Sequence, residues 1–316
     1  MQALVTGAAG FIGSTLSERL VAEGATVVGV DNLSDYYSTA TKRDNLAQID
    51  SDRFSFVHAD LNEIDLEPLV AEADVVFHIA GQPGVRGSWG EGFSEYVSAN
   101  ISATQRLLEA TSRTDSRPKF VYASSSSIYG DAEAYPTHEL TLPRPRSPYG
   151  VTKLAGEQLC RLYAATSGLS TVSLRFFTVY GPRQRPDMAF TRFLTAALTG
   201  TQIDVYGTGE QVRDFTYVDD IVDAVSRAAT VDVAPGSVYN VSGGGSHSVN
   251  EVLDIIEELT GRELNVRRQG SAAGDVARTS AETTAIRRDF SWTPRTDLRA
   301  GLQSQLEWVR GVLARA

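Results

Sequence analysis

Residues 2–13, QALVTGAAGFIG, join an apolar run to three glycines, and this stretch decides the fold. Gly7, Gly10 and Gly13 follow the run at three-residue spacing, ahead of a helix that we expect to start near Ser14. In such a turn the first glycine permits the tight bend, the second lets the backbone approach a pyrophosphate, and the third lets helix and strand pack closely. The pattern predicts a phosphate-binding turn at a helix N-terminus, although the glycines alone also fit a turn without a ligand.

Apolar runs alternate with helical patterns through the first half of the chain. TVVGVD, FSFVHADL, ADVVFHIAG, KFVYASS and TVSLRFF are apolar almost throughout, which is typical of strands buried on both faces. The stretches FSEYVSANISATQRLLEATS and YGVTKLAGEQLCRLYAATSG repeat apolar residues at helical spacing. The sequence predicts an α/β fold, a doubly wound parallel sheet (Rossmann) with a smaller mixed α/β substrate lobe.

The pattern loosens after Gly181-Pro182, where we expect the smaller lobe to begin. A later strand, SVYNVSGGG, is apolar enough to return to the main sheet, and the helix VNEVLDIIEEL and the strand ELNVRR follow it. We therefore expect one domain of residues 1–180 and 214–243, and a lobe of residues 181–213 and 244–316.

Composition excludes several classes of protein. Among 316 residues, no apolar stretch approaches the roughly 20 needed to cross a bilayer, and the start MQALVTG reads as a strand, so we expect no membrane association and no export. The formal charge of −10 argues against a nucleic-acid surface. A single cysteine, Cys160, excludes an internal disulfide and fits a reducing cytoplasm. The scattered histidines predict no metal site: His58, His78, His138 and His247.

Two carboxylates follow predicted strands. Asp31 ends TVVGVD, where it can accept hydrogen bonds from the adenosine ribose of a dinucleotide and would repel a 2′-phosphate. Since no arginine occupies positions 32–36, NAD is favoured over NADP. Asp60 could contact the adenine amino group, or it could cap the helix that follows.

Tyr149 and Lys153 lie four residues apart in SPYGVTKLAGE, on one face of a helix that Pro148 favours. A free tyrosine has a pKa of about 10, but an adjacent ammonium and an oxidised nicotinamide both favour the phenolate. Lys153 would also hold the nicotinamide ribose. A serine run at positions 124–127 follows another strand, at the sheet edge where ligands bind, and its hydroxyls could orient a substrate alcohol or merely fit beside a cofactor.

These motifs together resemble the extended short-chain dehydrogenase/reductase superfamily, and within it the nucleotide-sugar epimerases. The segments YASSSSIYG, SPYGVTK, VYGTGEQVRDFTYVDDIV and GDVART look like successive signatures of that group. Four segments look most like UDP-glucuronate 4-epimerases: DNLSDYYSTATKRDNL, GVRGSW, RFFTVYGPRQRPDM and GDVARTSA. The resemblance spans nearly the whole chain.

The resemblance implies an isomerase that converts UDP-glucuronate to UDP-galacturonate through a 4-keto intermediate. Tyr149 would remove the proton of the 4-hydroxyl while hydride passes to NAD, and rotation of the sugar before hydride return would invert C4. Ser125 matches the hydrogen-bonding partner of that hydroxyl. The related 4,6-dehydratases carry Asp-Glu at the positions of Ser126 and Ser127, so water elimination is not expected.

The resemblance also implies how the sugar is held. Ser126, Ser127, Thr178 and Arg185 would bind the uronate carboxylate, the arginine through a bidentate pair, although Arg185 could equally be a solvated charge in a turn. UDP-glucose epimerases commonly carry Asn where this chain has Thr178. A UDP-glucose or UDP-N-acetylglucosamine 4-epimerase is the alternative enzyme, and an NAD-sensing regulator without catalysis is an alternative of another class.

For the nucleotide, Arg213 and Arg278 would neutralise the pyrophosphate and Tyr206 and Phe190 would line the pocket, while Ala272 replaces an arginine of many relatives. The expected catalytic residues are Tyr149, Lys153 and Ser125. The expected cofactor contacts are Gly7, Gly10, Phe11, Ile12, Gly13, Asp31, Asn32, Asp60, Leu61, Ala80, Gln82, Asn100, Tyr149, Lys153 and Phe176. The expected substrate contacts are Arg86, Ser125, Ser126, Ser127, Thr178, Arg185, Phe190, Tyr206, Arg213 and Arg278. The two long helices would pair across a two-fold axis in the homodimer typical of the superfamily.

Overall fold

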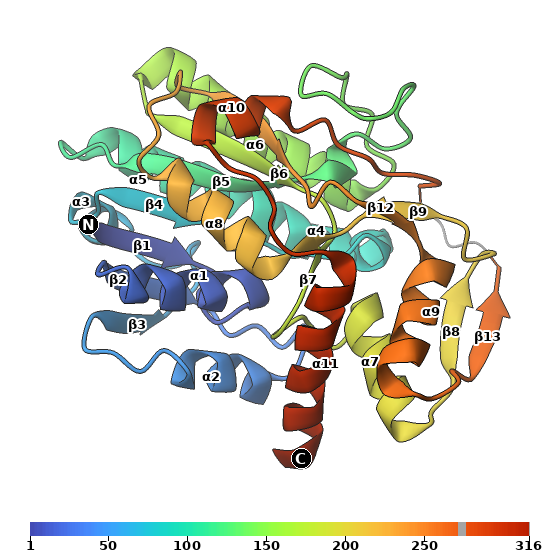
Figure 1. The fold of residues 1–316 in the computed structure, drawn as a ribbon. Coiled ribbons are helices and arrows are strands. Elements are labelled where there is room, and N and C mark those ends of the chain that lie inside the picture. The colour runs from blue at the N-terminus through green and yellow to red at the C-terminus, as the bar shows by residue number, and fades with distance from the viewer. Residues whose placement is uncertain (271–275, 316) are drawn as a thin grey trace.

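The computed structural model describes residues 1–270 and 276–315, in which a parallel sheet carries helices on both faces and a smaller lobe lies beside it (Figure 1). The seven strands run in the order β11-β6-β5-β4-β1-β2-β3, all parallel. This confirms the doubly wound fold and the return of the SVYNV strand to the main sheet. The strands are β1 (Gln2–Thr6), β2 (Thr26–Asp31), β3 (Phe54–His58), β4 (Val75–His78), β5 (Lys119–Ser125), β6 (Thr171–Phe176) and β11 (Ser237–Val241).

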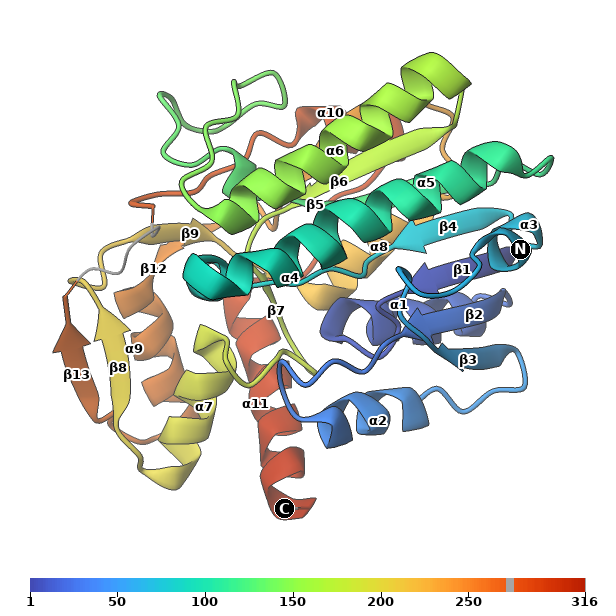
Figure 2. The same cartoon turned by 180° about the vertical axis from the view of Figure 1, so that it is seen from behind.

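Successive strand residues point into two different cores. Val5 and Phe77 face the core that contains residues of α1 (Phe11–Ala22) and α8 (Val218–Ala228). Leu4 and Val76 face the core that includes α5 (Ala103–Arg113) and α6 (Pro148–Ser167). Figures 1 and 2 show these two helical layers from opposite sides of the sheet. Burial on both faces explains why the strands read as continuous apolar runs.

The helix expected over residues 93–112 is interrupted. It forms α4 (Phe93–Val97), a π-helical turn at Ser98–Ser102, and then α5. The side chain of Asn100 in that turn accepts from the Gln82 N–H at 2.7 Å and donates to the Gln82 carbonyl at 3.0 Å. Single π turns of this kind often occur at functional sites, and this one clamps the loop that follows β4.

Local sequence sets both ends of α6. Ser147 caps the first turn by accepting from the Gly150 N–H at 3.1 Å, and Pro148 occupies the first helical position. Gly168 ends the helix in the left-handed region, at φ 68°.

The smaller lobe is built from short elements on one side of the sheet (Figure 1). Its strands pair two by two: β8 (Ile203–Tyr206) with β13 (Val266–Gln269), and β9 (Val212–Asp214) with β12 (Ser246–Ser248). Helices α7 (Ala189–Thr199), α9 (Val249–Thr260) and α11 (Leu298–Arg315) pack on one another. The remaining α-helices and strands of the described residues are α2 (Thr39–Ala47), α3 (Glu67–Ala71), β7 (Val179–Tyr180), β10 (Thr216–Tyr217) and α10 (Thr284–Phe290).

The chain near the C-terminus returns to the sheet domain before it forms α11. Helix α10 contacts β11, and the indole of the buried Trp292 donates to the Asp220 carbonyl of α8 at 3.0 Å. None of the helices in the described residues combines the length and apolar character needed to cross a membrane.

Candidate active site

The glycine turn after β1 packs so closely on neighbouring backbone that side chains are excluded. Gly7 adopts φ 73°, and a Cβ there would lie 2.8 Å from the backbone of Ala80. A Cβ on Gly13 would collide with the Gly7 carbonyl. Helix α1 begins at Phe11, three residues before the expected start, so Gly13 already belongs to it, and no side chain caps its N-terminus. The first N–H groups of α1 are therefore available to an anion.

Asp31 lies beside this turn at the end of β2. Its carboxylate accepts from the Ala9 N–H at 3.1 Å and from the Leu33 N–H at 2.8 Å. Lys42, which the sequence analysis did not consider, places its Nζ 4.0 Å from the same carboxylate and donates to the Ser34 carbonyl at 2.8 Å. The carboxylate is thus fixed between the glycine turn and the chain that follows β2.

Two further predicted cofactor residues contact each other near Asp31. Asn32 donates to Asp60 at 2.9 Å. Asp60 does not cap a helix, since the next helix, α3, begins at Glu67; it accepts instead from the Asn62 N–H at 2.8 Å.

Tyr149 and Lys153 occupy successive turns of α6, as predicted, and Lys153 is buried. The Lys153 Nζ lies 4.9 Å from the centre of the Tyr122 ring. Tyr149 hydrogen-bonds with Ser125, which lies at the end of β5, and its ring meets Tyr96 edge-on at 6.2 Å. A phenol, a hydroxyl and an ammonium are therefore gathered at the carboxyl edge of the sheet.

The electrostatics of this group differ from the expectation in one respect. Burial raises the pKa of Tyr149, and the Ser125 hydrogen bond and the positive charge of Arg185 act against that rise without cancelling it. The sequence predicts a lowered pKa of Tyr149 from Lys153 together with the positive charge of the cofactor. In the protein without the cofactor the pKa of Tyr149 is raised instead, because burial outweighs the opposing effects of Ser125 and Arg185. Burial also lowers the pKa of Lys153 to about 8.

The serine run divides into distinct roles. Ser124 is buried and donates to Glu157 at 2.8 Å, so it is committed to the interior. The Ser125 hydroxyl accepts from the Ser127 N–H at 3.1 Å. Ser126 and Ser127 are partly exposed, and the Ser127 hydroxyl accepts from the Ser125 hydroxyl at 3.1 Å.

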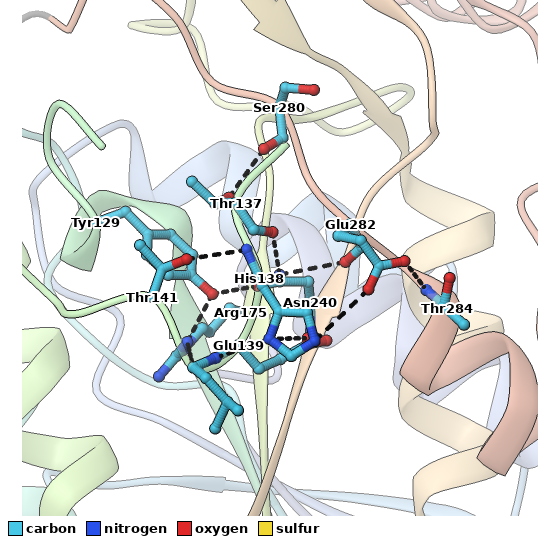
Figure 3. Close-up of polar contacts among 11 residues, drawn as sticks. Tyr129, Thr137, His138, Glu139, Thr141, Arg175, Asn240, Ser280, Glu282 and Thr284 are labelled. Atoms are coloured by element: carbon cyan, nitrogen blue, oxygen red, sulfur yellow. Dashed lines mark hydrogen bonds and ion pairs between the residues drawn. The ribbon is translucent and has the colours of Figure 1, made fainter. Parts of the chain in front are cut away.

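A buried ion pair joins α6 to the sheet. Arg175 on β6 donates to both carboxylate oxygens of Glu157, at 2.9 and 2.6 Å, and Glu157 is one turn beyond Lys153 on α6. Arg175 also donates to the Tyr129 hydroxyl at 2.6 Å, which in turn donates to Asn240 at 2.7 Å (Figure 3). The network ties α6 to β6 and β11.

Arg185 is mostly buried, with 16% of its side chain exposed, and it is not a solvated charge. It forms a bidentate pair with Asp187, with both N–O distances at 2.9 Å. Its guanidinium carbon lies 5.5 Å from the centre of the Tyr36 ring. Its charge acts on the pKa of Tyr149, so Arg185 belongs to the same group of residues as the Tyr149 phenol.

Predicted nucleotide-binding residues come together at the smaller lobe. The Arg86 guanidinium stacks 3.9 Å from the centre of the Tyr206 ring. This contact joins the loop after β4 to β8. Arg213 on β9 donates to the Val212 carbonyl at 2.9 Å, and Arg278 forms a β-bridge with Val212. Ala272 lies outside the described residues.

The other predicted residues lie deeper. Phe190 is buried, with its ring 4.7 Å from Phe215. Phe176, the last residue of β6, pairs with Ser125 across the sheet, and Thr178 follows it with a partly exposed side chain. Leu61 is buried and Ala80 is partly exposed.

One group of possible metal ligands is present among the described residues, and the sequence analysis missed it. His138 lies 3.9 Å from Glu139 and 3.9 Å from Glu282, on two segments far apart in the chain (Figure 3). The Thr137 N–H donates to the Ser280 carbonyl at 2.7 Å and holds these segments together.

Comparison with known proteins gives the family. Residues 3–242 match the NAD dependent epimerase/dehydratase family. The chain belongs to this family.

Similar members of the NAD dependent epimerase/dehydratase family include both uronate and neutral-sugar enzymes. The Bacillus subtilis protein "Uncharacterized UDP-glucose epimerase YtcB" is 40% identical over 98% of both chains. UDP-glucuronate 4-epimerase 6 of Arabidopsis thaliana is 38% identical over 98% of this chain and 72% of its own length. The crystal structure of UDP-glucuronic acid 4-epimerase from Bacillus cereus, in complex with UDP-glucuronic acid and NAD, has a TM-score of 0.95 at 38% identity, over 99% of this chain and all of that one. The predicted family resemblance is confirmed.

Proposed function

We propose that this protein is an NAD-dependent UDP-glucuronate 4-epimerase that interconverts UDP-glucuronate and UDP-galacturonate. The observation that carries the proposal is the grouping of Tyr149 and Ser125 with Arg185, whose charge acts on the phenol. An acid/base residue beside a buried guanidinium suits a sugar that carries both a reacting hydroxyl and a carboxylate. The relatives named UDP-glucuronate 4-epimerase support this choice.

The residues present fit NAD. Gly7 and Gly13 leave no room for a Cβ, which fits the tight bend and the close helix–strand packing of a dinucleotide-binding turn. Asp31 is placed to accept from the adenosine ribose hydroxyls. Asn32, Asp60, Leu61, Ala80, Gln82, Asn100 and Phe176 would complete the site with Phe11, Ile12, Lys153 and Tyr149. NAD would supply the hydride acceptor and donor at C4.

The chain itself would move the proton. Tyr149 takes the proton of the 4-hydroxyl and later returns it on the opposite face of the sugar, while Ser125 orients that hydroxyl. Ser126, Ser127, Thr178 and Arg185 would hold the carboxylate throughout. This restraint matters because a 4-keto uronate is a β-keto acid that can lose carbon dioxide.

The nucleotide would bind between the two parts of the chain. We propose that residues 1–180 and 214–243 bind NAD and that residues 181–213 and 244–316 bind the UDP moiety. Arg213 and Arg278 would pair with the pyrophosphate, while Arg86, Tyr206 and Phe190 would surround the nucleoside. The stack of Arg86 on Tyr206 supports this placement, because it brings the two parts together.

We also propose a cytoplasmic homodimer that forms through the outer face of α6. Val151 and Leu162 on that face are 48% and 53% exposed, and Trp89 and Phe93 beside it are 51% and 38% exposed. A groove of about 540 Å³ runs between Trp89, Phe93, Pro145 and Val151. Contiguous exposed apolar side chains of this kind mark interaction surfaces.

Incubation of the purified protein with UDP-glucuronate, without added NAD, tests the proposed function. We expect UDP-galacturonate, identified by proton NMR and mass spectrometry, because the hydride is returned in every turnover and the cofactor stays bound. Exclusive formation of a UDP-pentose would contradict the proposal, and complete inactivity on a panel of UDP-sugars would favour a non-catalytic NAD-binding role.

The Bacillus subtilis relative favours a second candidate, a 4-epimerase of neutral UDP-sugars such as UDP-glucose or UDP-N-acetylglucosamine. The values of kcat/KM for the acidic and neutral sugars separate the two candidates. If Arg185→Ala left turnover of UDP-glucuronate intact, the carboxylate assignment would be wrong.

A further inference from the structure

Asp187 holds one edge of the Arg185 guanidinium. Its two carboxylate oxygens accept from Nε and Nη2, each at 2.9 Å. A guanidinium presents five N–H groups in a rigid fork, and this side-on pair uses two of them. The Nη1 end of the fork remains outside the pair.

The Arg185 guanidinium also contacts Tyr36. The guanidinium carbon lies 5.5 Å from the centre of the Tyr36 ring, and the Tyr36 hydroxyl lies so close to Gly84 that a Cβ there would be 2.6 Å from it. Burial works to lower the pKa of Arg185, but Asp187 outweighs it and the pKa is raised. Arg185 is therefore a permanently charged group with a fixed direction.

We propose that Asp187 is a positioning residue that sets the preference of the site for acidic over neutral UDP-sugars. It keeps the Nη1 end of the Arg185 fork aimed at the substrate carboxylate. This inference rests on the proposed function and assigns a role to a residue that does not itself touch the sugar.

Two physical arguments favour positioning over competition with the substrate. The side-on pair and an end-on pair use different N–H groups, so that one guanidinium can hold Asp187 and a substrate carboxylate together. An arginine side chain also has much rotamer freedom, and the Asp187 pair removes part of it before the substrate arrives.

Loss of the restraint that Asp187 places on Arg185 should increase decarboxylation of the intermediate. In the 4-keto uronate, the C5–C6 bond breaks, carbon dioxide leaves, and the electron pair enters an enolate across C4 and C5 that then takes up a proton. A firmly held carboxylate opposes this step. A loosened Arg185 will therefore raise the share of UDP-4-keto-pentose and UDP-pentose among the products.

The test compares Asp187→Asn with the wild type on UDP-glucuronate, with UDP-glucose as a competitive inhibitor. For Asp187→Asn we expect kcat/KM for UDP-glucuronate to fall by about tenfold or more, as misplacement of a positioned group does. The Ki of UDP-glucose should stay within about twofold, since a neutral sugar gains nothing from the pair. The decarboxylated share of the products should rise.

Asp289→Asn is a matched control. Asp289 accepts side-on from Nε and Nη2 of Arg288, at 2.6 and 2.9 Å, on α10. This control variant should retain the wild-type rate, the Ki and the product ratio.

Each alternative result has a definite meaning. A higher kcat/KM of Asp187→Asn for UDP-glucuronate would show that Asp187 competes with the substrate, and an equal loss for both sugars would show a merely structural role. Either result, or no change, overturns the inference. If the wild type fails to turn over UDP-glucuronate, the proposed function itself is wrong, so the two failures are distinguishable.

Discussion

At the scale of single residues, the proposed chemistry depends on one phenol. Tyr149→Phe removes the hydroxyl that would exchange a proton with the substrate but keeps the ring that packs on Tyr96. Because general acid/base residues contribute about 10²–10⁴-fold, we expect kcat to fall by that factor while UDP-sugar binding is retained. Product formation by NMR and ligand-induced thermal shift measure the two effects. A variant with more than half of the wild-type rate would exclude Tyr149 as the acid/base.

Lys153 gives a prediction about stability. Burial lowers its pKa from 10.5 to about 8, which corresponds to about 3 kcal/mol of penalty on the charged form. Between these two pH values the unfolded chain binds the proton and the folded chain does not, so the stability of the wild type rises with pH there. Lys153→Met removes the penalty.

We therefore expect Lys153→Met to be inactive yet more stable than the wild type at pH 7, by up to about 3 kcal/mol. The difference should shrink as pH rises from 8 to 10.5 and then vanish. Urea unfolding at several pH values measures it, and Tyr149→Phe, which keeps the lysine, should follow the wild-type curve. A variant less stable than the wild type at pH 7 would contradict this account.

Residue-level prediction succeeded where the partners are close in sequence. Tyr149 and Lys153 are one helical turn apart, so their spacing alone places them on one face. Asp187 and Tyr36 were missed for a different reason. The sequence predicted Arg185 as a carboxylate contact or a solvated charge, and only the fold shows that its turn lies against Tyr36 and near Tyr149.

At the scale of elements, the pair of Glu157 and Arg175 joins α6 to β6 inside the protein. Both side chains are almost wholly buried, at 0% and 2% exposure. Removal of one partner of a buried pair leaves an uncompensated charge and costs about 3–5 kcal/mol. We therefore expect Arg175→Met to lose this much stability in urea unfolding.

The exposed pair of Arg299 and Glu258 offers the comparison, since exposed pairs contribute about 0–1 kcal/mol. Arg299→Met should be nearly neutral. The double variant of Arg175→Met and Glu157→Gln should recover part of the loss, because the amide carries no charge. If Arg175→Met were as mild as Arg299→Met, the buried pair would not be what holds α6 on the sheet.

The elements themselves could be predicted to different extents. The strands of the main sheet were found because burial on both faces leaves a continuous apolar run. The π turn at Ser98–Ser102 was not found; its Asn100 side chain contacts the backbone of Gln82, 18 residues away, and no local pattern marks such a contact. Strands of two or three residues, such as β7 and β12, are too short to carry a pattern.

At the scale of the whole molecule, the proposed homodimer makes a direct prediction. Val151→Glu combined with Leu162→Glu introduces two charges on the outer face of α6, and burial of an unpaired charge in an interface is strongly unfavourable. We expect this variant to elute as a monomer in size-exclusion chromatography with light scattering, at a concentration where the wild type is dimeric.

Leu142→Glu is the control, because Leu142 is also exposed, at 66%, but lies outside α6. It should elute as the wild type does. A wild type that is monomeric at high concentration would contradict the proposed homodimer.

The period of α6 has one more consequence. Tyr149, Lys153 and Glu157 form a row along its inner side, while Val151 and Leu162 lie exposed on its outer side. If the outer side pairs with a second copy, the same helix forms the dimer interface and carries the Tyr149 phenol. Turnover per enzyme molecule would then decline when the enzyme is diluted below the dissociation constant of the dimer, with a lag as the subunits separate.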